Sequence, residues 1–286
     1  MILRRNIARI DITKSDRNGV RVVPDVVAVE EPLEIRIGYY SGGARIEKSI
    51  SITMRTPGDD FELAAGFLFS ESIIRNAGDI ETIAYCLEKT SAPETVQQYN
   101  IVTVSLRPGM SVDIQRLERH FYTSSSCGVC GKASLEALQI AACPARQMGS
   151  VAMAAAAVLS LPEKLKKAQK VFEKTGGLHG AGLFDAEGNL VASNEDVGRH
   201  NALDKLIGSQ LLRRSANFAE QVLAVSGRTS FEIMQKSFVA GIPIVVAVGA
   251  PSSLAVELAT TFKMTLIGFV RADSFNIYSG AERIRM

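Results

Sequence analysis

Short apolar segments alternate with helix-forming segments over the second half of the chain, and this alternation restricts the fold most. The segments of strand length are 222–226, 244–248 and 266–270. The helices are predicted to start near Val197, Ser230 and Ser252. Buried strands separated by helices are typical of a largely parallel sheet with helices on both faces. The sequence therefore predicts an α/β fold.

The region just before these strands predicts a helix followed by a hairpin. Leu161, Leu165, Ala168 and Phe172 recur at helical spacing, and Gly176 is a suitable end for that helix. Apolar segments at 178–184 and 189–193 flank the turn 185–188, so a hairpin is expected.

The first third of the chain predicts a smaller sheet. Apolar residues alternate at 33–37, turn residues follow at 41–43, and a second alternating segment spans 46–54. This order predicts a hairpin. A helix is expected from Asp60 and a further strand at 101–106. We therefore expect a small N-terminal α/β roll domain at 1–115 and a larger α/β domain at 116–286.

Composition excludes several classes of protein. The 286 residues are 47% hydrophobic and 22% charged, with a formal net charge of +2, which argues against a disordered or general polyanion-binding chain. There is no tryptophan and no interleaving of aromatic and basic residues, so we expect no nucleic-acid partner. The longest apolar runs are too short to span a bilayer, so we expect no membrane association.

The N-terminus and the cysteine count bear on location. Arg4-Arg5 is not followed by an apolar stretch of signal-peptide length, and we interpret it as part of a surface arm. Four cysteines without even spacing do not form a disulfide framework. These features predict a cytoplasmic protein.

The segment 124–132, Ser-Ser-Ser-Cys-Gly-Val-Cys-Gly-Lys, is the strongest indication of chemistry. It places Cys127 and Cys130 in a polar, glycine-rich loop before a helix-forming stretch. A helix N-terminus and the nearby Lys132 lower the pKa of a thiol and favour the nucleophilic thiolate. The segment predicts a reactive sulfur site.

Four other interpretations of this cysteine pair stay open at this point, and one of them is a chemically inert pair of thiols. A four-cysteine zinc site needs a second pair, whereas Cys86 and Cys143 are single and distant. A mixed site would recruit a histidine from elsewhere in the chain, and a thioredoxin-like dithiol would follow a buried strand. The histidines are His120, His179 and His200. We predict no metal at this site.

Two strand-to-helix crossings carry glycine and hydroxyl residues that suit a ligand. They are Ser226-Gly227-Arg228-Thr229-Ser230 and Gly249-Ala250-Pro251-Ser252-Ser253. Helix N-termini at the carboxyl ends of strands bind anions, and Arg228 adds a charged donor. Ordinary helix capping explains either crossing alone. Two at one sheet edge favour an anionic ligand.

The segment 194–201 concentrates polar side chains at a predicted helix start. Asn194 or Asp196 suffices for a cap, whereas Glu195, Arg199, His200 and Asn201 exceed that need and favour a site. His179 is compatible with either a core position or a functional one. The roles of His179, Glu195, Arg199 and His200 stay open.

Five motifs resemble those of the FdhD/NarQ family of formate dehydrogenase accessory sulfurtransferases, or sulfur carrier proteins, from about residue 25 to the end. They are C-G-V-C-G-K-A-S at 127–134, T-G-G-L-H at 175–179, E-D-V-G-R-H-N-A-L-D-K at 195–205, S-G-R-T-S-F-E at 226–232 and F-N-I-Y-S-G at 275–280.

This resemblance implies a function. Family members accept persulfide sulfur from a cysteine desulfurase and transfer it to the bis(molybdopterin guanine dinucleotide) cofactor that formate dehydrogenase requires. The persulfide-carrying cysteine corresponds to Cys127 and its partner to Cys130. The cofactor-binding segment corresponds to Phe269, Val270, Arg271, Ala272, Asp273 and Ser274. We add Arg228, Thr229 and Ser230 to it, with Arg228 and Arg271 as phosphate contacts and GDP as a mimic of the substrate.

The resemblance also implies a cytidine-deaminase-like three-layer α/β/α domain and a homodimer. Deamination itself is excluded, because His179-Gly180-Ala181 lacks the glutamate of the zinc deaminases and no P-C-x-x-C follows. A cofactor-binding chaperone without sulfur transfer is the alternative function.

Overall fold

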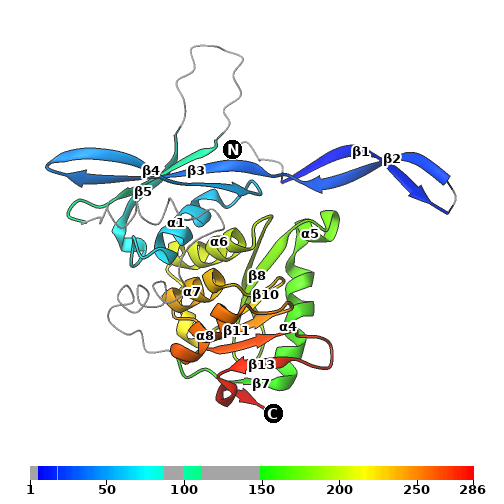
Figure 1. Ribbon diagram of the computed structural model, residues 1–286. Helices are drawn as coiled ribbons and strands as arrows, with labels where there is room; N and C mark the ends of the chain where they lie inside the picture. The colour runs from blue at the N-terminus through cyan, green and yellow to red at the C-terminus, as the bar shows by residue number, and fades with distance from the viewer. Residues whose placement is uncertain (1–5, 18, 87–98, 111–148) are drawn as a thin grey trace.

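The computed structural model describes residues 6–17, 19–86, 99–110 and 149–286. It is a mixed α/β fold with several sheets, stacked in layers from the top to the bottom of Figure 1. The expected domain boundary near residue 115 and the Cys127/Cys130 loop lie outside these residues. One continuous apolar core includes buried side chains from both the first and the second half of the chain.

A four-stranded sheet forms the upper layer. Its strands are β3 (Glu31–Ser41), β4 (Ala44–Arg55), β5 (Ile80–Tyr85) and β6 (Ile101–Leu106), in the order β4-β3-β6-β5. β3 and β4 form the predicted hairpin, and Leu33, Ile35 and Ile37 of β3 are fully buried. Helix α1 (Asp60–Ser70) lies beneath this sheet and begins where the sequence predicts.

The larger sheet has six strands in the order β13-β12-β11-β10-β8-β9. They are β8 (His179–Phe184), β9 (Leu190–Asp196), β10 (Val222–Val225), β11 (Ile244–Ala247), β12 (Thr265–Gly268) and β13 (Asn276–Ser279). Only the three central strands β10, β11 and β12 run parallel. The prediction of a largely parallel sheet is therefore wrong, because the β8–β9 hairpin and the returning β13 add antiparallel pairs.

Helices cover both faces of the six-stranded sheet. Helices α6 (Arg199–Leu212), α7 (Phe231–Ala240) and α8 (Ser253–Thr261) share one core with α1, whereas α4 (Ala155–Ala168) packs on the opposite face. Side chains along each strand point alternately to the two faces of the sheet, and each face has its own apolar core. In β10, Leu223 packs in the core on the α6 side and Val222 in the core on the α4 side. Helix α5 (Lys170–Thr175) follows a break at Gln169 that the sequence did not indicate, and it ends at Gly176 as predicted.

The N-terminal hairpin packs little against the rest of the described fold. β1 (Ile7–Asp16) and β2 (Gly19–Ala28) pair antiparallel and extend away from the body in Figure 1, with α5 contacting β2. Val20 and Val22 are each 70% exposed. The sequence indicated a surface arm here but not its strands.

Short elements complete the described chain. They are the 3₁₀ turns η1 (Ala77–Asp79), η2 (Phe218–Glu220) and η3 (Ala281–Arg283), and the parallel pair of β7 (Met153–Ala154) with β14 (Ile284–Arg285).

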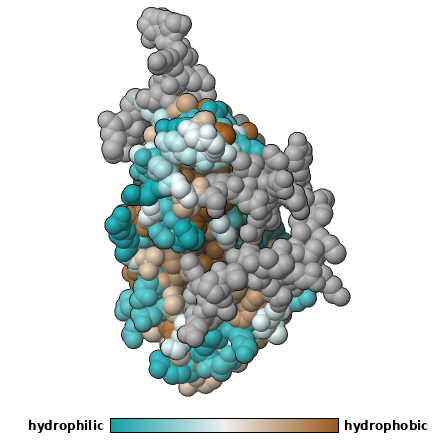
Figure 2. Space-filling model, turned by 90° about the vertical axis from the view of Figure 1, so that its left-hand side faces the viewer, coloured by the Kyte–Doolittle hydropathy of each residue, from teal (hydrophilic) through white to brown (hydrophobic). Residues whose placement is uncertain are grey.

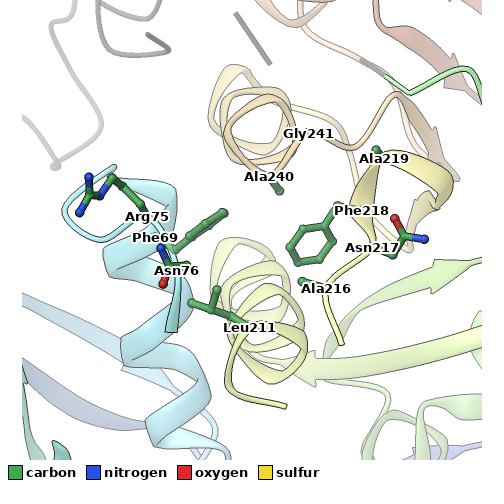
Figure 3. Close-up of a pocket in the computed structure, with 10 residues that line it drawn as sticks. All are labelled: Phe69, Arg75, Asn76, Leu211, Ala216, Asn217, Phe218, Ala219, Ala240 and Gly241. Atoms are coloured by element: carbon green, nitrogen blue, oxygen red, sulfur yellow. The ribbon is translucent and has the colours of Figure 1, made fainter. Parts of the chain in front are cut away.

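A hollow of about 340 Å³ lies where the C-terminal ends of α1, α6 and α7 meet η2. Phe69, Leu211 and Phe218 line it, and Arg75 is its charged residue (Figure 3). Hydrophobic surface also gathers at the centre of the side drawn in Figure 2. Because η2 precedes β10, the hollow is at the amino edge of the six-stranded sheet, away from the predicted ligand-binding loops.

Helices α1 and α6 cross at two glycines. A Cβ atom added to Gly66 would lie 1.8 Å from the carbonyl oxygen of Asp204, and one added to Gly208 would lie 1.9 Å from that of Glu62. Each helix therefore fits the other only because these positions carry no side chain. This contact holds the four-stranded sheet, through α1, against the helices that cover the six-stranded sheet.

We predict that Gly208→Ala destabilises the fold by about 3 kcal/mol or more, because an overpacked contact between backbones cannot relax by side-chain rotation. The gain in helix propensity of about 1 kcal/mol from glycine to alanine acts in the opposite direction and is smaller. Urea unfolding measures the change. Gly177→Ala is the control, since its added Cβ would meet nothing closer than 3.7 Å. Equal stability of Gly208→Ala and the wild type would contradict the close crossing.

Candidate functional site

The carboxyl ends of β9, β10, β11 and β12 meet the start of β8 at one edge of the six-stranded sheet. Asp196 at the end of β9 pairs with His179, and Ser226 after β10 donates its N–H to the oxygen of Gly180 at 3.0 Å. Beyond the strands, Gly249 N donates to Gly227 O at 3.0 Å and Phe269 N donates to Gly249 O at 3.1 Å. These bonds join the predicted ligand-binding loops in one row, as expected for a sheet of this kind.

The loop 226–230 brings polar groups to the start of α7. Ser230 occupies the N-cap position without a side-chain capping bond, and its Oγ lies 3.2 Å from Nε2 of His200. Thr229 is buried, and its Oγ1 has no hydrogen-bond partner among the described residues. Arg228 is exposed. The loop therefore offers more than helix capping requires.

The loop 249–253 is different. Ser252 Oγ accepts a bond of 3.2 Å from the N–H of Ala255 and caps α8. The capping alternative accounts for Ser252.

The segment 269–274 follows β12 at the same edge. Phe269 is 40% exposed and has a φ of 55°, in the left-handed region that non-glycine residues rarely adopt. Nη1 of Arg271 donates to the carbonyl oxygens of Val248 and Val270 at 2.8 and 3.0 Å. Its guanidinium group is therefore anchored to the backbone. Val270 is buried, whereas Arg271, Ala272, Asp273 and Ser274 are exposed.

The segment 194–201 separates into structural residues and residues that face the edge. Glu195 accepts bonds of 2.7 and 2.9 Å from the N–H groups of Val171 and Phe172 and so caps α5. Asn201 donates to the carbonyl oxygen of Met54 at 2.7 Å. The structure thus gives Glu195 and Asn201 structural roles, in place of the site that the sequence favoured.

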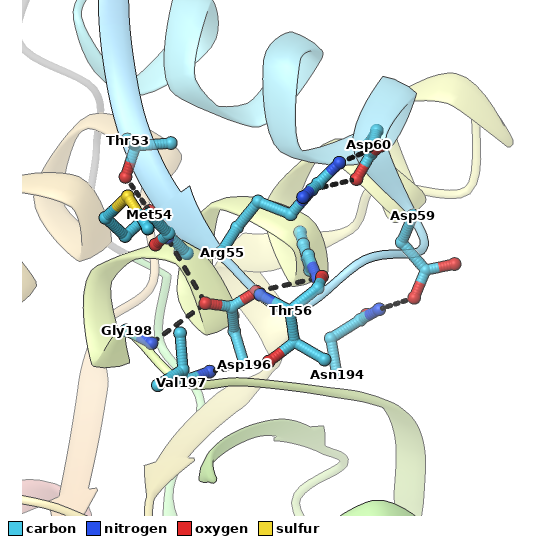
Figure 4. Close-up of polar contacts among 12 residues, drawn as sticks. Thr53, Met54, Arg55, Thr56, Asp59, Asp60, Asn194, Asp196, Val197 and Gly198 are labelled. Carbon is cyan, nitrogen blue, oxygen red and sulfur yellow. Dashed lines mark hydrogen bonds and ion pairs between the residues drawn. The ribbon is translucent and has the colours of Figure 1, made fainter. Parts of the chain in front are cut away.

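Asp196 is the centre of a buried polar network that joins α6 to the end of β4 (Figure 4). Its Oδ2 lies 2.7 Å from Nζ of Lys205 and accepts a bond of 3.0 Å from the N–H of Thr56. Its Oδ1 accepts a bond of 2.8 Å from the N–H of Gly198. Asp196 is fully buried and Lys205 is 2% exposed, so this network fixes where α6 begins.

Two further buried ion pairs support the same joint. Arg55 binds Asp60 through two bonds of 2.8 and 3.0 Å, and Lys236 of α7 binds Asp204 of α6 at 2.9 Å. These pairs were not predicted from the sequence. Asp204 and Lys205 are the last two residues of the E-D-V-G-R-H-N-A-L-D-K motif, and the concentration of charge in this motif was the one feature of the sequence that could have indicated their ion pairs.

His179, Arg199 and His200 remain at the edge. A Cβ atom added to Gly227 would lie 3.2 Å from Nδ1 of His179, so this imidazole packs against the loop backbone. Burial lowers the pKa of His179, and the charges of Arg199 and Arg228 lower it further. Burial, followed by Arg199 and Lys236, lowers the pKa of His200 to about 4. Both imidazoles are therefore neutral at pH 7.

The remaining site predictions fall outside what the structure describes. Cys127 and Cys130 lie in the segment 111–148. Cys86 is half-buried at the end of β5. Among the described side chains, no group of three or more His, Cys, Asp or Glu residues is placed to hold a metal ion. Within the same ranges, no helix is both long and apolar enough to cross a membrane.

The fold and this loop-lined edge define a mixed α/β protein with a candidate anion-binding site at its sheet edge. Comparison with known proteins is more specific: the FdhD/NarQ family matches residues 28–285, and the chain belongs to this family.

Relatives of the chain cover nearly its whole length. The sulfur carrier protein FdhD of Streptomyces coelicolor is 46% identical over 285 residues, which is 99% of this chain and 95% of the relative. The protein of the same name from Sulfolobus acidocaldarius is 42% identical over 279 residues, 97% of this chain and 98% of the relative.

A solved structure shows the same fold. It is a crystal structure from Desulfotalea psychrophila described as a putative formate dehydrogenase accessory protein, with a TM-score of 0.73 and 24% identity. The match covers 98% of this chain and 100% of that one.

We predict that Asp196→Asn destabilises the protein by about 3–5 kcal/mol, because it leaves the buried Lys205 ammonium group without its counter-charge. Urea unfolding measures the loss. A double variant with Lys205→Met should lose less than the sum of the two single changes. Glu163→Gln, which breaks an ion pair whose side chains are 74% and 72% exposed, is the control and should cost well under 1 kcal/mol.

The pKa of His200 predicts a pH dependence of stability. Between pH 6.5 and about pH 4 the unfolded chain binds a proton at His200 and the folded chain does not. Lower pH in this window therefore stabilises the unfolded state, and the free energy of unfolding falls. We expect a less steep decline in His200→Gln, measured by urea unfolding across the window. Parallel pH profiles for the two proteins would exclude this contribution.

Proposed function

We propose that this protein is a sulfurtransferase that carries sulfur as a cysteine persulfide for formate dehydrogenase. It accepts the sulfur from a cysteine desulfurase and transfers it to the bis(molybdopterin guanine dinucleotide) cofactor, which is its substrate. The main support is similarity over nearly the full length to proteins named sulfur carrier protein FdhD, together with the Cys127-Gly128-Val129-Cys130 motif in this chain.

The cysteine pair suffices for both transfer steps. The Cys127 thiolate attacks the terminal sulfur of the desulfurase persulfide, and the desulfurase cysteine leaves as a thiolate. Cys127 then carries an S–SH group. Attack by the Cys130 thiolate on the inner sulfur forms a Cys127–Cys130 disulfide and releases hydrosulfide for the metal of the cofactor. A dithiol reductant returns the pair to the thiol state.

The nucleotide part of the substrate binds at the carboxyl edge of the six-stranded sheet. We assign Phe269, Val270, Arg271, Ala272, Asp273 and Ser274 to this site, with Arg228, Thr229 and Ser230 from the neighbouring loop. The hydrogen-bonded row of loops, the N-terminus of α7 and the unpartnered Oγ1 of Thr229 support this assignment. Arg228 is the stronger candidate for phosphate, because Arg271 is already bonded to backbone carbonyls.

Three further expectations belong to this proposal. The helices on both faces of the six-stranded sheet suit a cytidine-deaminase-like arrangement, with the chemistry carried by the cysteine loop instead of a zinc centre. We also propose a cytoplasmic location and a homodimer. A cofactor-binding chaperone without sulfur transfer remains the alternative function, and it requires no sulfur adduct on Cys127.

We predict that Cys127→Ser abolishes persulfide formation, because it removes the nucleophile that accepts the sulfur. Mass spectrometry of protein incubated with a cysteine desulfurase and cysteine detects the added sulfur atom. Cys86→Ser is the matched control and should load like the wild type, since Cys86 lies at the end of β5 in the other sheet. Loading of Cys127→Ser but not of Cys130→Ser would reverse the two roles. No adduct on the wild type would favour the chaperone.

A further inference from the structure

Two helix N-termini and one strand start converge beside the loop 226–230. β9 ends at Asp196 and leads into α6, whose first residues are Arg199 and His200. His179 begins β8 opposite Asp196, and its ring packs on Gly227. His200 contacts Ser230 at the start of α7. Side chains from α6, β8 and the β10–α7 loop therefore share one place at the sheet edge.

Neither of the two arginines there forms an ion pair with a described residue, and the charge that Arg199 shares with a carboxylate is the longer-range attraction of Glu232. Nε of Arg199 is buried without a hydrogen-bond partner in the described part of the chain. Arg228 forms no ion pair with any described residue. An unsatisfied buried guanidinium N–H is costly, and an anionic ligand would satisfy it.

The acidic groups nearby neutralise only part of the charge of these arginines. The carboxylate of Asp196 is already bound to Lys205. Glu232 lies 3.8 Å from His200, and its side chain is 56% exposed. One exposed carboxylate faces two guanidinium groups, and both imidazoles are neutral at pH 7. The net charge at this place is positive, and the neutral imidazoles add hydrogen-bond donors without charge.

From this arrangement we infer that Arg199, His179 and His200 form, together with Arg228, the subsite that binds the phosphate groups of the nucleotide substrate. Phosphate oxygens match the forked donors of two guanidinium groups and the N–H groups of a helix N-terminus. The inference rests on the proposed function for the nucleotide. It adds Arg199 and the two histidines to the residues assigned above and places the phosphates between α6 and α7.

Titration calorimetry with GDP, guanosine and pyrophosphate tests this subsite. Arg199→Gln should weaken GDP and pyrophosphate binding about ten- to a hundredfold, the loss expected for one charge-assisted contact. Guanosine affinity should not change, because guanosine carries no phosphate. Arg213→Gln, at the exposed far end of the same helix, is the matched control and should bind GDP like the wild type.

Thermal unfolding shows whether Arg199→Gln folds. If it does not fold, a second variant, His200→Gln, tests the same subsite. His200→Gln should weaken GDP binding by about three- to tenfold, the effect of a neutral hydrogen bond. Wild-type affinity for GDP in every folded variant of the two would overturn the subsite. Tight binding of pyrophosphate without binding of GDP would also overturn it, since the site would then serve a free phosphate compound.

Failure of the subsite and failure of the proposed function give different results. If Arg228→Ala weakens GDP binding and Arg199→Gln does not, the nucleotide lies at the β10–α7 loop away from α6, and only this inference is wrong. If wild-type Cys127 gains no sulfur from a desulfurase, the sulfur-transfer function is wrong whatever the nucleotide data show.

Discussion

The position of the candidate site depends on one buried carboxylate. Asp196 receives the Lys205 ammonium group and the backbone N–H groups of Thr56 and Gly198. A carboxylate in this environment is stable only with all of these partners, because an unpaired buried charge costs several kcal/mol. Thr56 directly follows β4, whereas Gly198 precedes α6 and Lys205 lies in it. The start of α6 therefore cannot move relative to β4 without breaking the network. Arg199 and His200 are the first residues of α6, so the network fixes their backbone positions as well.

The segment 195–201 therefore carries both structural residues and residues that face the candidate site. Glu195, Asp196 and Asn201 hold neighbouring elements together, while Arg199 and His200 face the carboxyl edge of the sheet. Side chains that bind a ligand must be held within narrow geometric limits by their surroundings. The buried ion pair of Asp204 with Lys236 extends this support to α7, whose N-terminus lies at the same edge. The candidate site thus lies at the N-termini of α6 and α7, two helices that a buried ion pair holds together.

Much of the fold was predictable from local pattern. The β3–β4 hairpin, α1 and the alternation of β10, α7, β11, α8 and β12 follow from apolar periodicity and turn residues, which act over short stretches of chain. The antiparallel pairing of β13 with β12 was not predictable, because no local pattern encodes that contact. The roles of Glu195 and Asn201 were not predictable either. Both look like site residues in sequence, and only the approach of α5 and β4 shows that they bind backbone.

The crossing of α1 and α6 at Gly66 and Gly208 has a consequence for synthesis of the chain. The ribosome synthesises α1 and all strands of the four-stranded sheet long before residue 208 leaves the exit tunnel. Until then, the apolar face of α1 lacks the helix that buries it. Contacts so distant in sequence form late, and exposed apolar surface favours aggregation during that interval. Molecular chaperones that bind nascent chains would therefore find their target on α1 in the first half of the protein.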